Sequence, residues 1–424
     1  MLGYDSYIDS QIPYVGLIPS YWKVVQNKRV MHKEKRICSS YAGQDILSLT
    51  MNGVVIRNLD AGGKMPTTFD GYQFVYPGEL LMCLFDIDVT PRCVGRVNNM
   101  GLTSPAYSSF VLHENADLGY FYYYYLMLDH TKELLHLAKN LRHSLTEEQL
   151  GQIYVPLPPI LEQRTIASYL DKKIERIDFL ISEAKASIEE YKSWKASIIY
   201  EVVTRGLDPD VEMKDSGVEW IGKIPSQWKL VRMKYLIGFM PKCDYSFCKE
   251  DTLVTFTPME CIRTGTFENR SRPYGDIDGS YTQYAEGDIV LAKVTPCFEN
   301  GNVCIMSGLY SGVGFGSSEL FVLRPQKVLD RFLLYFLQHN GFKDAACSTM
   351  TGTGGLKRVS SSFIQNCYIP YPDMDTQKAI ADYLDRKCSA IQSLICEKES
   401  LIADLEAYKK SLIFEVVTGK RRVV

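Results

Sequence analysis

The sequence lacks the motifs that mark common enzymes acting on nucleotides or on DNA. It contains no Gly-x-x-x-x-Gly-Lys-Ser/Thr loop, no Asn/Asp-Pro-Pro-Tyr/Phe element of an amino-methyltransferase, and no His-Glu-x-x-His pattern among its 6 histidines. The first absence argues against a P-loop NTPase and the last against a zinc site of the protease type. Glu183 and Lys185 imitate the Glu-x-Lys of a nuclease, but they fall within the long helical pattern described below. We therefore do not expect catalysis by this chain.

Membrane, export and metal features are missing as well. No apolar run approaches the roughly 18 residues needed to span a bilayer, and the start, MLGYDSYIDSQIP, has neither the basic nor the apolar region of a signal peptide. The 12 cysteines form no Cys-x-x-Cys pair, and the closest two, Cys243 and Cys248, have no second pair beside them. These patterns predict a cytoplasmic protein with reduced, mostly buried thiols and no metal site.

Positive charge is not in excess. The chain has 47 Lys and Arg against 50 Asp and Glu, a net charge of −3, which argues mildly against nucleic-acid binding. Phosphate contact depends on local clusters, however, and three basic clusters occur, at 27–36, 356–358 and 419–422. The balance of charge leaves DNA binding open.

What the sequence does contain is a repeat. Ile-Pro-Ser-x-Trp-Lys occurs at 18–23 and again 206 residues later at 224–229. Further on the offset drifts, so that Gly78-Glu79 matches Gly287-Asp288 and Phe-Val-Leu at 110–112 matches the same letters at 321–323. From 153 to 204 the chain pairs with 367–418 without a gap, at 22 identities in 52 positions. Each half is thus a variable body closed by a preserved tail.

Each tail is predicted to be one long helix. From Leu170 to Val202, apolar positions alternate steps of four and three residues, which is a heptad pattern, and the second copy repeats it from Leu384 to Val416. Prolines precede both helices, Asp373 or Asp375 is placed to cap the second, and Gly206 and Gly419 suit their ends. A helix over 162–203 would be about 60 Å long.

A helix this long with a single apolar stripe needs a partner, and its own copy is the simplest one. Two similar units in one chain pack most simply about a pseudo-twofold axis, which makes the helices over 162–203 and 376–417 antiparallel. Lys195 and Lys409 share one heptad position. They either fix the register of the pair or mark a place where the helices splay, and the sequence leaves both open.

The two ends of the chain are predicted to lie together. After Thr204 the chain runs on into the second body, whereas after Thr418 only six residues remain. The segment that precedes the first body, 7–22, corresponds to the segment that links the first tail to the second body. It would follow the second tail if the chain were closed into a ring, which places the N-terminus beside the end of the second tail.

The bodies, roughly 20–150 and 226–365, are predicted to be α+β. Gly-Glu-Leu-Leu-Met-Cys-Leu-Phe at 78–85 and its counterpart at 287–294 indicate short apolar strands after a glycine turn. The apolar runs at 118–128 and 329–339 are buried helices or strands, which periodicity does not decide. Four tyrosines, 122–125, suggest base stacking, but the matching Leu-Leu-Tyr-Phe in the other copy favours a place in the core.

Two similar modules on a rigid spacer suit the reading of two DNA half-sites at a fixed separation. Half-sites one turn apart lie on the same face of the duplex, about 34 Å from centre to centre. Because the two bodies differ in sequence, the two half-sites are expected to differ, which makes the target asymmetric.

The chain resembles the specificity subunit of Type I restriction–modification systems. The resemblance rests on the two tails, on Gly-Val-Glu-Trp-Ile-Gly-Lys-Ile-Pro-Ser-Gln-Trp at 217–228, and on the segment 292–319, and it covers essentially the whole chain. It implies two α+β target-recognition domains in a pseudo-twofold arrangement, separated by an antiparallel coiled coil of two long helices. The predicted parts are a first target-recognition domain (1–152), a central long helix (153–206), a second target-recognition domain (207–366) and a C-terminal long helix (367–424).

The resemblance also implies partners and cofactors. The family subunit has no catalysis of its own and assembles with two modification subunits that bind S-adenosylmethionine and methylate adenine N6. Restriction subunits that use ATP and Mg²⁺ join some complexes. This chain is therefore expected to bind double-stranded DNA and two methyltransferase subunits, and to hold no cofactor or metal itself. The recognised bases and the spacer length are not predictable from residue types.

Candidate DNA contacts lie in corresponding loops of the two bodies. Side chains that read base edges or hold phosphates are Arg, Lys, Asn, Gln and Thr. In the first body we select Arg92, Arg96, Asn98 and Asn99, and in the second Lys293, Thr295, Asn300, Asn302, Lys357 and Arg358. Valine-Thr-Pro occurs in both loops, but Glu-Asn-Gly-Asn follows only in the second, so the two target specificities should not match.

Candidate partner contacts lie on the long helices. One angular stripe of the first helix carries Tyr169, Leu180 and Trp194, and the second repeats it with Tyr383, Leu394 and Tyr408. We expect these side chains either to dock the methyltransferase subunits or to pack against the bodies of this same chain. The alternative function is a non-catalytic scaffold that displays two protein-binding modules.

Overall fold

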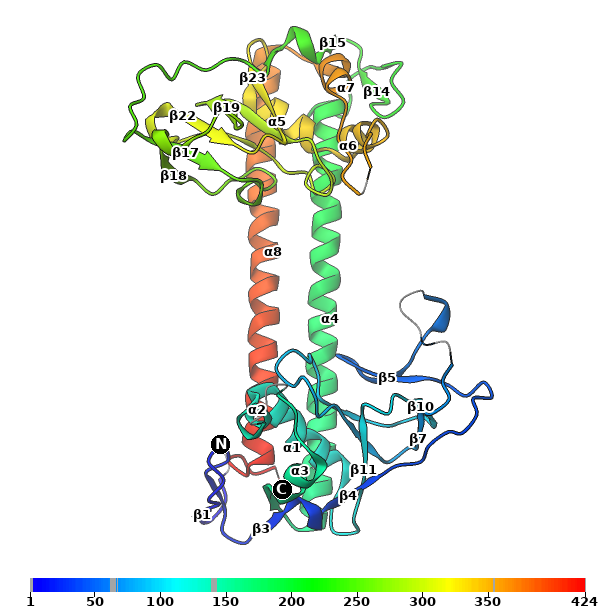
Figure 1. Ribbon diagram of the computed structural model, residues 1–424. Helices are drawn as coiled ribbons and strands as arrows, with labels where there is room; N and C mark the ends of the chain where they lie inside the picture. The colour runs from blue at the N-terminus through cyan, green and yellow to red at the C-terminus, as the bar shows by residue number, and fades with distance from the viewer. Residues whose placement is uncertain (1–2, 62–65, 67, 139–142, 354, 424) are drawn as a thin grey trace. The chain divides into compact units, whose positions relative to one another are not determined.

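The structure is a computed structural model of the whole chain that describes every residue except 1–2, 62–65, 67, 139–142, 354 and 424 (Figure 1). It divides into two compact units. Unit 1 comprises Met1–Ala184 and Ser400–Val424, and unit 2 comprises Lys185–Glu399. Both boundaries fall inside the two long helices, so each unit holds one half of each.

Unit 1 holds twelve short strands, three whole helices and one part of each long helix among its described residues. The strands are β1 (Tyr7–Asp9), β2 (Leu17–Pro19), β3 (Lys23–Gln26), β4 (Met31–Glu34), β5 (Leu47–Thr50), β6 (Gly53–Ile56), β7 (Gln73–Val75), β8 (Leu80–Met82), β9 (Val94–Arg96), β10 (Gly101–Thr103), β11 (Ser108–Leu112) and β12 (Tyr154–Leu157). The helices are α1 (Leu118–Thr131), α2 (Glu133–Leu137), α3 (Glu147–Gln152) and the start of α4 (Ile160–Arg205).

Unit 2 repeats this order with longer insertions. Its strands are β13 (Met213–Asp215), β14 (Lys223–Pro225), β15 (Lys229–Arg232), β16 (Ile237–Phe239), β17 (Leu253–Thr257), β18 (Arg270–Pro273), β19 (Thr282–Ala285), β20 (Ile289–Ala292), β21 (Val303–Ile305), β22 (Val313–Gly316), β23 (Leu320–Pro325) and β24 (Tyr368–Tyr371). Its helices are α5 (Asp330–Gln338), α6 (Asn340–Cys347), α7 (Ser361–Asn366) and α8 (Met374–Val417), whose last turns belong to unit 1.

The same antiparallel sheet forms the centre of both units. Its strand order is β4-β11-β8-β9 in unit 1 and β16-β23-β20-β21 in unit 2. The strands predicted at 78–85 and 287–294 are its third members, and their side chains are fully buried, as expected for short apolar runs. Mixed helices and sheets in each unit confirm the predicted α+β class.

The strand register corrects one part of the predicted repeat. Phe110 lies opposite Leu80, whereas Leu323 lies opposite Ile289. Since Leu80 and Ile289 are equivalent, the structural counterpart of Phe110 is Leu323 and not Phe321. The match between the two Phe-Val-Leu triplets is therefore wrong by two residues. A shift of two keeps every side chain on the same face of the sheet, which is why alternation alone did not reveal it.

The apolar runs at 118–128 and 329–339 are helices, α1 and α5. Asp117 caps α1 by accepting the Tyr120 N–H at 3.0 Å. Tyr123, Tyr124 and Tyr125 are buried, and Tyr122 lies half-buried beneath the guanidinium of Arg96. The core interpretation of the four tyrosines is confirmed, and none of them is placed for base stacking.

The long helices agree with the predicted tails. Helix α4 has 46 residues and α8 has 44, and Asp373 caps α8 by accepting the Thr376 N–H at 2.8 Å. Gly206 and Gly419 follow the helices with φ values of 80° and 72°, the left-handed conformation that favours glycine at a helix end. All heptad positions from Leu170 to Val202 and from Leu384 to Val416 are buried or half-buried.

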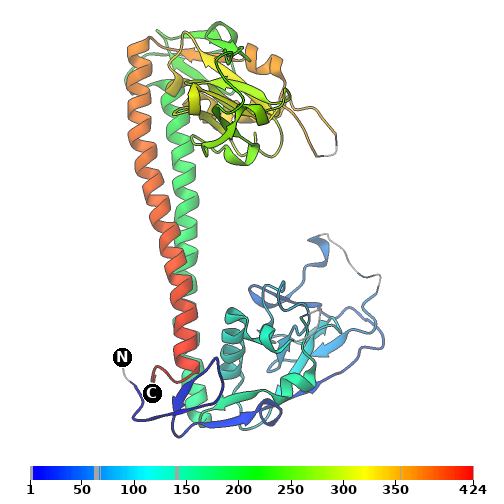
Figure 2. The same cartoon turned by 60° about the vertical axis from the view of Figure 1, so that its left-hand side comes forward.

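In each unit α4 and α8 lie side by side and run in opposite directions (Figures 1 and 2). In unit 1, Lys409 of α8 bonds Asp178 of α4, and in unit 2, Lys195 of α4 donates to Gln392 of α8 at 3.3 Å. From the first pair to the second, α4 advances 17 residues while α8 goes back 17. Both lysines thus reach the opposite helix in one register, which favours the register-fixing interpretation over splaying.

The two ends of the chain pack together within unit 1, as predicted. The Lys420 ammonium donates to the carbonyls of Val15 and Leu17. A Cβ added at Gly419 would lie 3.1 Å from Cη2 of Trp22, and one added at Gly206 would lie 3.1 Å from Cζ2 of Trp228. The end of α8 therefore meets the first Ile-Pro-Ser-x-Trp segment as the end of α4 meets the second.

Candidate nucleic-acid interface

In unit 2 the candidate residues gather where β20 meets the segment 351–358. The Thr295 hydroxyl donates to the carbonyl of Gly355 at 2.8 Å and accepts the Lys357 N–H at 3.0 Å. The Thr295 N–H donates to the Lys357 carbonyl at 2.9 Å. Thr295 is nearly buried, so its part is to hold the segment that carries Lys357 and Arg358 against the sheet.

The charges of this cluster are partly compensated. Nε and Nη2 of Arg358 each donate to Glu319 at 2.8 Å, and the pKa of the Glu319 carboxyl is lowered chiefly by this hydrogen bonding. Lys293 donates to the Ser318 carbonyl at 2.7 Å. The exposed Lys357 makes no ion pair among the described residues. It is the cation of this cluster best placed to meet a phosphate.

The two asparagines of unit 2 have different surroundings. Asn300 is exposed in the loop between β20 and β21, whereas Asn302 is 8% exposed and continues into β21. A duplex can reach the first without rearrangement of the loop, but not the second.

In unit 1, Arg96 has a structural partner. It lies 4.5 Å from the ring centre of Tyr122, and its Nη2 donates to Asp171 at 2.9 Å. Tyr123 donates to the same carboxylate at 2.8 Å. In unit 2 the equivalent Asp385 accepts Tyr335 at 2.7 Å and pairs with Arg331. This network joins each body to its long helix, and Arg96 serves that connection.

The other candidates of unit 1 are accessible. Asn98 and Asn99 are exposed in the turn between β9 and β10, and Arg92 is half-buried. Arg92 makes no hydrogen bond or ion pair within the part of the chain that the structure describes. Its guanidinium is therefore available to a ligand.

The structure adds His143, which sequence reasoning missed. The Ile87 N–H donates to the His143 carbonyl in unit 1 as the Thr295 N–H donates to the Lys357 carbonyl in unit 2, so His143 occupies the place of Lys357. The imidazole is half exposed and lies 4.0 Å from Asp88. The ungapped pairing of the two tails begins at residue 153 with an offset of 214 residues, and the same offset relates 143 to 357. Extending this pairing by ten residues towards the N-terminus would have identified His143.

On the long helices, four of the six candidate partner residues are exposed to solvent. Leu180, Trp194, Leu394 and Tyr408 are between 37% and 49% exposed. Tyr169 and Tyr383 are half-buried against the cores of units 1 and 2, respectively. Phe179 and Leu401 are exposed as well and were not predicted. Phe179 lies outside the stripe, one residue from Leu180, whereas Leu401 lies on it, seven residues from both Leu394 and Tyr408.

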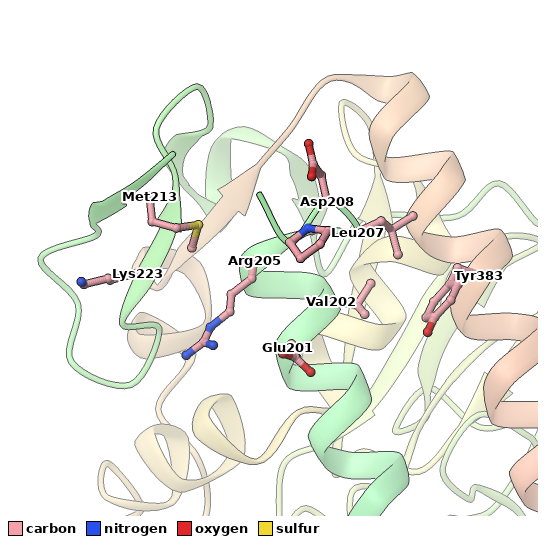
Figure 3. Close-up of a pocket in the computed structure, with 10 residues that line it drawn as sticks. Glu201, Val202, Arg205, Leu207, Asp208, Met213, Lys223 and Tyr383 are labelled. Atoms are coloured by element: carbon pink, nitrogen blue, oxygen red, sulfur yellow. The ribbon is translucent and has the colours of Figure 1, made fainter. Parts of the chain in front are cut away.

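A cavity of about 700 Å³ lies beside Tyr383 in unit 2 (Figure 3). It opens where the chain leaves α4, and Arg205 and Lys223 line it together with Glu201 and Asp208. The figure shows these side chains coming from α4, from the turn that follows it and from the β13–β14 hairpin, with Tyr383 projecting from α8. The mixture of acids and bases gives no surface of one sign for a phosphate backbone.

Residues 96–190 and 226–398 match the family model described as Type I restriction modification DNA specificity domain. These segments make up more than half of the chain. The chain belongs to this family. Curated relatives include the Type I restriction enzyme EcoAI specificity subunit of Escherichia coli, 34% identical over 193 residues, which are 44% of this chain and 32% of that one. The MjaVIII specificity subunit of Methanocaldococcus jannaschii is 29% identical over 286 residues, which are 64% and 63% of the two chains. The match thus spans about a third of the length of the Escherichia coli relative.

Solved structures show the same fold in this specificity-subunit family. A chain from a type I R-M system superimposes with a TM-score of 0.71 over 94% of this chain and 98% of that one, at 15% identity. The HsdS subunit from Thermoanaerobacter tengcongensis gives a TM-score of 0.52 over 95% and 98%, at 16% identity. Across the described residues, no helix is long and apolar enough to cross a membrane, and no group of three or more His, Cys, Asp or Glu side chains is arranged to hold a metal.

Proposed function

We propose that this specificity subunit reads a split, asymmetric DNA site, with unit 1 reading one half and unit 2 the other. The observation that carries the proposal is that the two units share the same central sheet but have different side chains on the corresponding loops. The central sheets have the same strand order, yet Lys357 and Arg358 in unit 2 stand where unit 1 has His143 and Ser144. Because the two central sheets have the same strand order, they place the corresponding loops in the same way. Because the side chains on these loops differ, the two units are expected to recognise different half-sites.

The long helices set the spacing of the half-sites and dock two methyltransferase subunits. Their register is held by Lys195 and Lys409, which fixes which part of each helix faces the other. The exposed side chains Leu180, Trp194, Leu394 and Tyr408 offer apolar and aromatic area of the kind enriched at protein interfaces.

Chemistry is supplied by the partner subunits. Methylation of a base in duplex DNA needs a pocket that receives the extruded base, and the modification subunits bring this pocket with S-adenosylmethionine. Where restriction subunits join the complex, they bring ATP and Mg²⁺. This chain contributes recognition and acts without a cofactor of its own, in the cytoplasm.

The test is a map of methylated adenines made by the chain co-expressed with its methyltransferase subunits. We expect one motif of two unlike halves with a spacer of constant length, and no methylation by the chain alone with S-adenosylmethionine and DNA. The same methylated sites with and without this chain would contradict the proposal and favour a scaffold. Methylation by the isolated chain would make it an enzyme.

A further inference from the structure

Unit 1 contains a cavity on one face of its central sheet, beside Arg92. It has a volume of about 270 Å³ and lies between the end of β5, the loop that follows β8 and the turn that precedes β11. Its lining includes Thr50, Met51, Cys83, Phe85, Arg92 and Tyr107. All of these belong to the described part of unit 1.

The strand register relates this cavity to a packed part of the core of unit 2. The Cys83 N–H donates to the Cys93 carbonyl at 2.9 Å, and the Ala292 N–H donates to the Asn302 carbonyl at 3.0 Å, so Cys83 and Ala292 are equivalent. In unit 2, Ile262 from the insertion after β17 and Leu320 close the sheet face around Ala292 into a core. In unit 1 the end of the β5–β6 hairpin, at Leu49, Thr50 and Met51, forms one wall of the cavity, and Cys83 lines it too.

The walls suit a planar, partly apolar group with hydrogen-bond acceptors. The rings of Phe85 and Tyr107 are 6.2 Å apart and 25° from parallel. Arg92 makes no hydrogen bond or ion pair among the described residues, whereas Arg36 and Arg96 of the same unit bind carboxylates of Glu79 and Asp171. A guanidinium left unpaired beside two aromatic rings has its donors free for a ligand.

We propose that this cavity is the base-reading site of unit 1, with Arg92 as the residue that specifies a guanine. This inference rests on the proposed function. The cavity is smaller than the roughly 300–1,000 Å³ of small-molecule sites, so it suits the edge of a base pair better than a free cofactor. Arg92 donates to O6 and N7 of the guanine, the commonest specific contact of an arginine in the major groove. The aromatic and thioether walls contact the C5-methyl group of a neighbouring thymine.

The experiment uses the complete complex of this chain with its methyltransferase subunits. Methylated adenines are mapped on a plasmid library that is randomised at every position of both half-sites. With Arg92→Ala, we expect the preference for guanine over the other bases to fall about 5- to 150-fold at one position of one half-site. The other half-site and the spacer length should be unchanged. Arg92→Lys keeps the charge but not the fork of donors, so it should bind DNA and still lose the guanine preference.

Two further variants keep the test decisive. Arg164→Ala removes an exposed arginine of α4, outside the cavity, and should leave the motif unchanged. Tyr107→Ala should weaken the preference for thymine beside the affected guanine. An unchanged motif with Arg92→Ala and Arg92→Lys would overturn the proposal. So would loss of the methyltransferase subunits from the Tyr107→Ala complex, because the cavity would then bind protein. Failure of the proposed function is distinct, since the unaltered complex would show no split motif.

Discussion

The ammonium of Lys409 on α8 lies 2.5 and 2.8 Å from the two carboxylate oxygens of Asp178 on α4. Lysine at a heptad position is costly to bury, and this one is 20% exposed with its charge directed at the partner helix. Such a pair selects one register of the helices more than it adds stability.

A double-mutant cycle with Lys409→Met and Asp178→Asn measures that pair. Because Asp178 is half exposed, we expect a coupling of about 0.2–1 kcal/mol in urea unfolding at low salt, decreasing at 0.5 M NaCl. A coupling above about 2 kcal/mol would show that the pair is a main source of stability, contrary to this expectation.

Gln163 fastens the start of α4 to its body through its buried amide. The side chain accepts the Asp117 N–H at 2.8 Å and donates to the carbonyls of Asn115 and Pro158 at 3.0 and 2.8 Å. Gln163→Leu leaves the buried Pro158 carbonyl and the two partly buried groups of Asn115 and Asp117 without this partner, so we expect a loss of about 2–5 kcal/mol in the free energy of unfolding.

Gln377 makes the equivalent bonds in unit 2, to the Leu329 N–H and the Pro372 carbonyl. Gln377→Leu should therefore cost about as much as Gln163→Leu. The control is Gln152→Leu, at an exposed glutamine of α3, expected within about 0.5 kcal/mol of the unaltered chain. A Gln163→Leu chain as stable as that control would disprove the fastening role.

His339 makes the stability of unit 2 depend on pH. Burial lowers the pKa of its imidazole to about 3. Nδ1 accepts the Phe342 N–H at 3.2 Å, and Nε2 is buried without a partner among the described residues. The unfolded chain takes up a proton near pH 6.5 that the folded chain refuses, so stability is full above that pH and is lost as the pH falls towards 3.

The matched variant is His339→Asn, which can still cap α6 but does not titrate. Between pH 7.5 and pH 5 the unaltered chain should lose about 2 kcal/mol more than the variant, measured by urea unfolding at both values. Equal losses would show that His339 does not govern this pH range.

Lys357 and Arg358 are expected to hold the DNA backbone beside unit 2. Lys357→Ala with Arg358→Ala should weaken binding of the cognate site by the complete complex, and Lys357→Ala alone should reduce the slope of log K against log salt by about 1. Arg358→Ala alone should have a smaller effect, because Glu319 already compensates that guanidinium. Unchanged affinity of the double variant in a salt titration would remove both residues from the interface.

Trp194 is expected to contact a methyltransferase subunit. It is 49% exposed on α4, so Trp194→Ala should leave the unfolding midpoint of the chain unchanged and lower the amount of methyltransferase that co-purifies. Lys192→Ala, an exposed change two residues away on the opposite side of the helix, serves as the control. Full stoichiometry with Trp194→Ala would contradict the docking role.

The long helices were predictable because their determinants are local. These determinants are the heptad spacing, the Asp373 cap and the glycine after each helix. Each lies within a few residues of the part of the helix that it determines. The closeness of the two ends followed from comparing the repeats, since the segment before Trp22 resembles the segment before Trp228.

The roles of the loop residues were not predictable, because they depend on partners far away in the sequence. Arg96 is held by Asp171, and Arg358 by Glu319. Neither ion pair follows from residue types or spacing. The cavity beside Arg92 depends on where the β5–β6 hairpin ends relative to the sheet. The two-residue error in matching Phe110 shows that the sequence of a short strand does not determine its register.

The paired contacts of Gly206 with Trp228 and of Gly419 with Trp22 bear on how new members of this family originate. Each long helix closes onto the opening segment of a body through the same junction, so the gene has two equivalent places at which bodies can be exchanged. A crossover within either preserved tail would bring in a foreign body without disturbing the helix pair. Under the proposed function, one such exchange would change one half of the target and leave the surfaces of the long helices as they were.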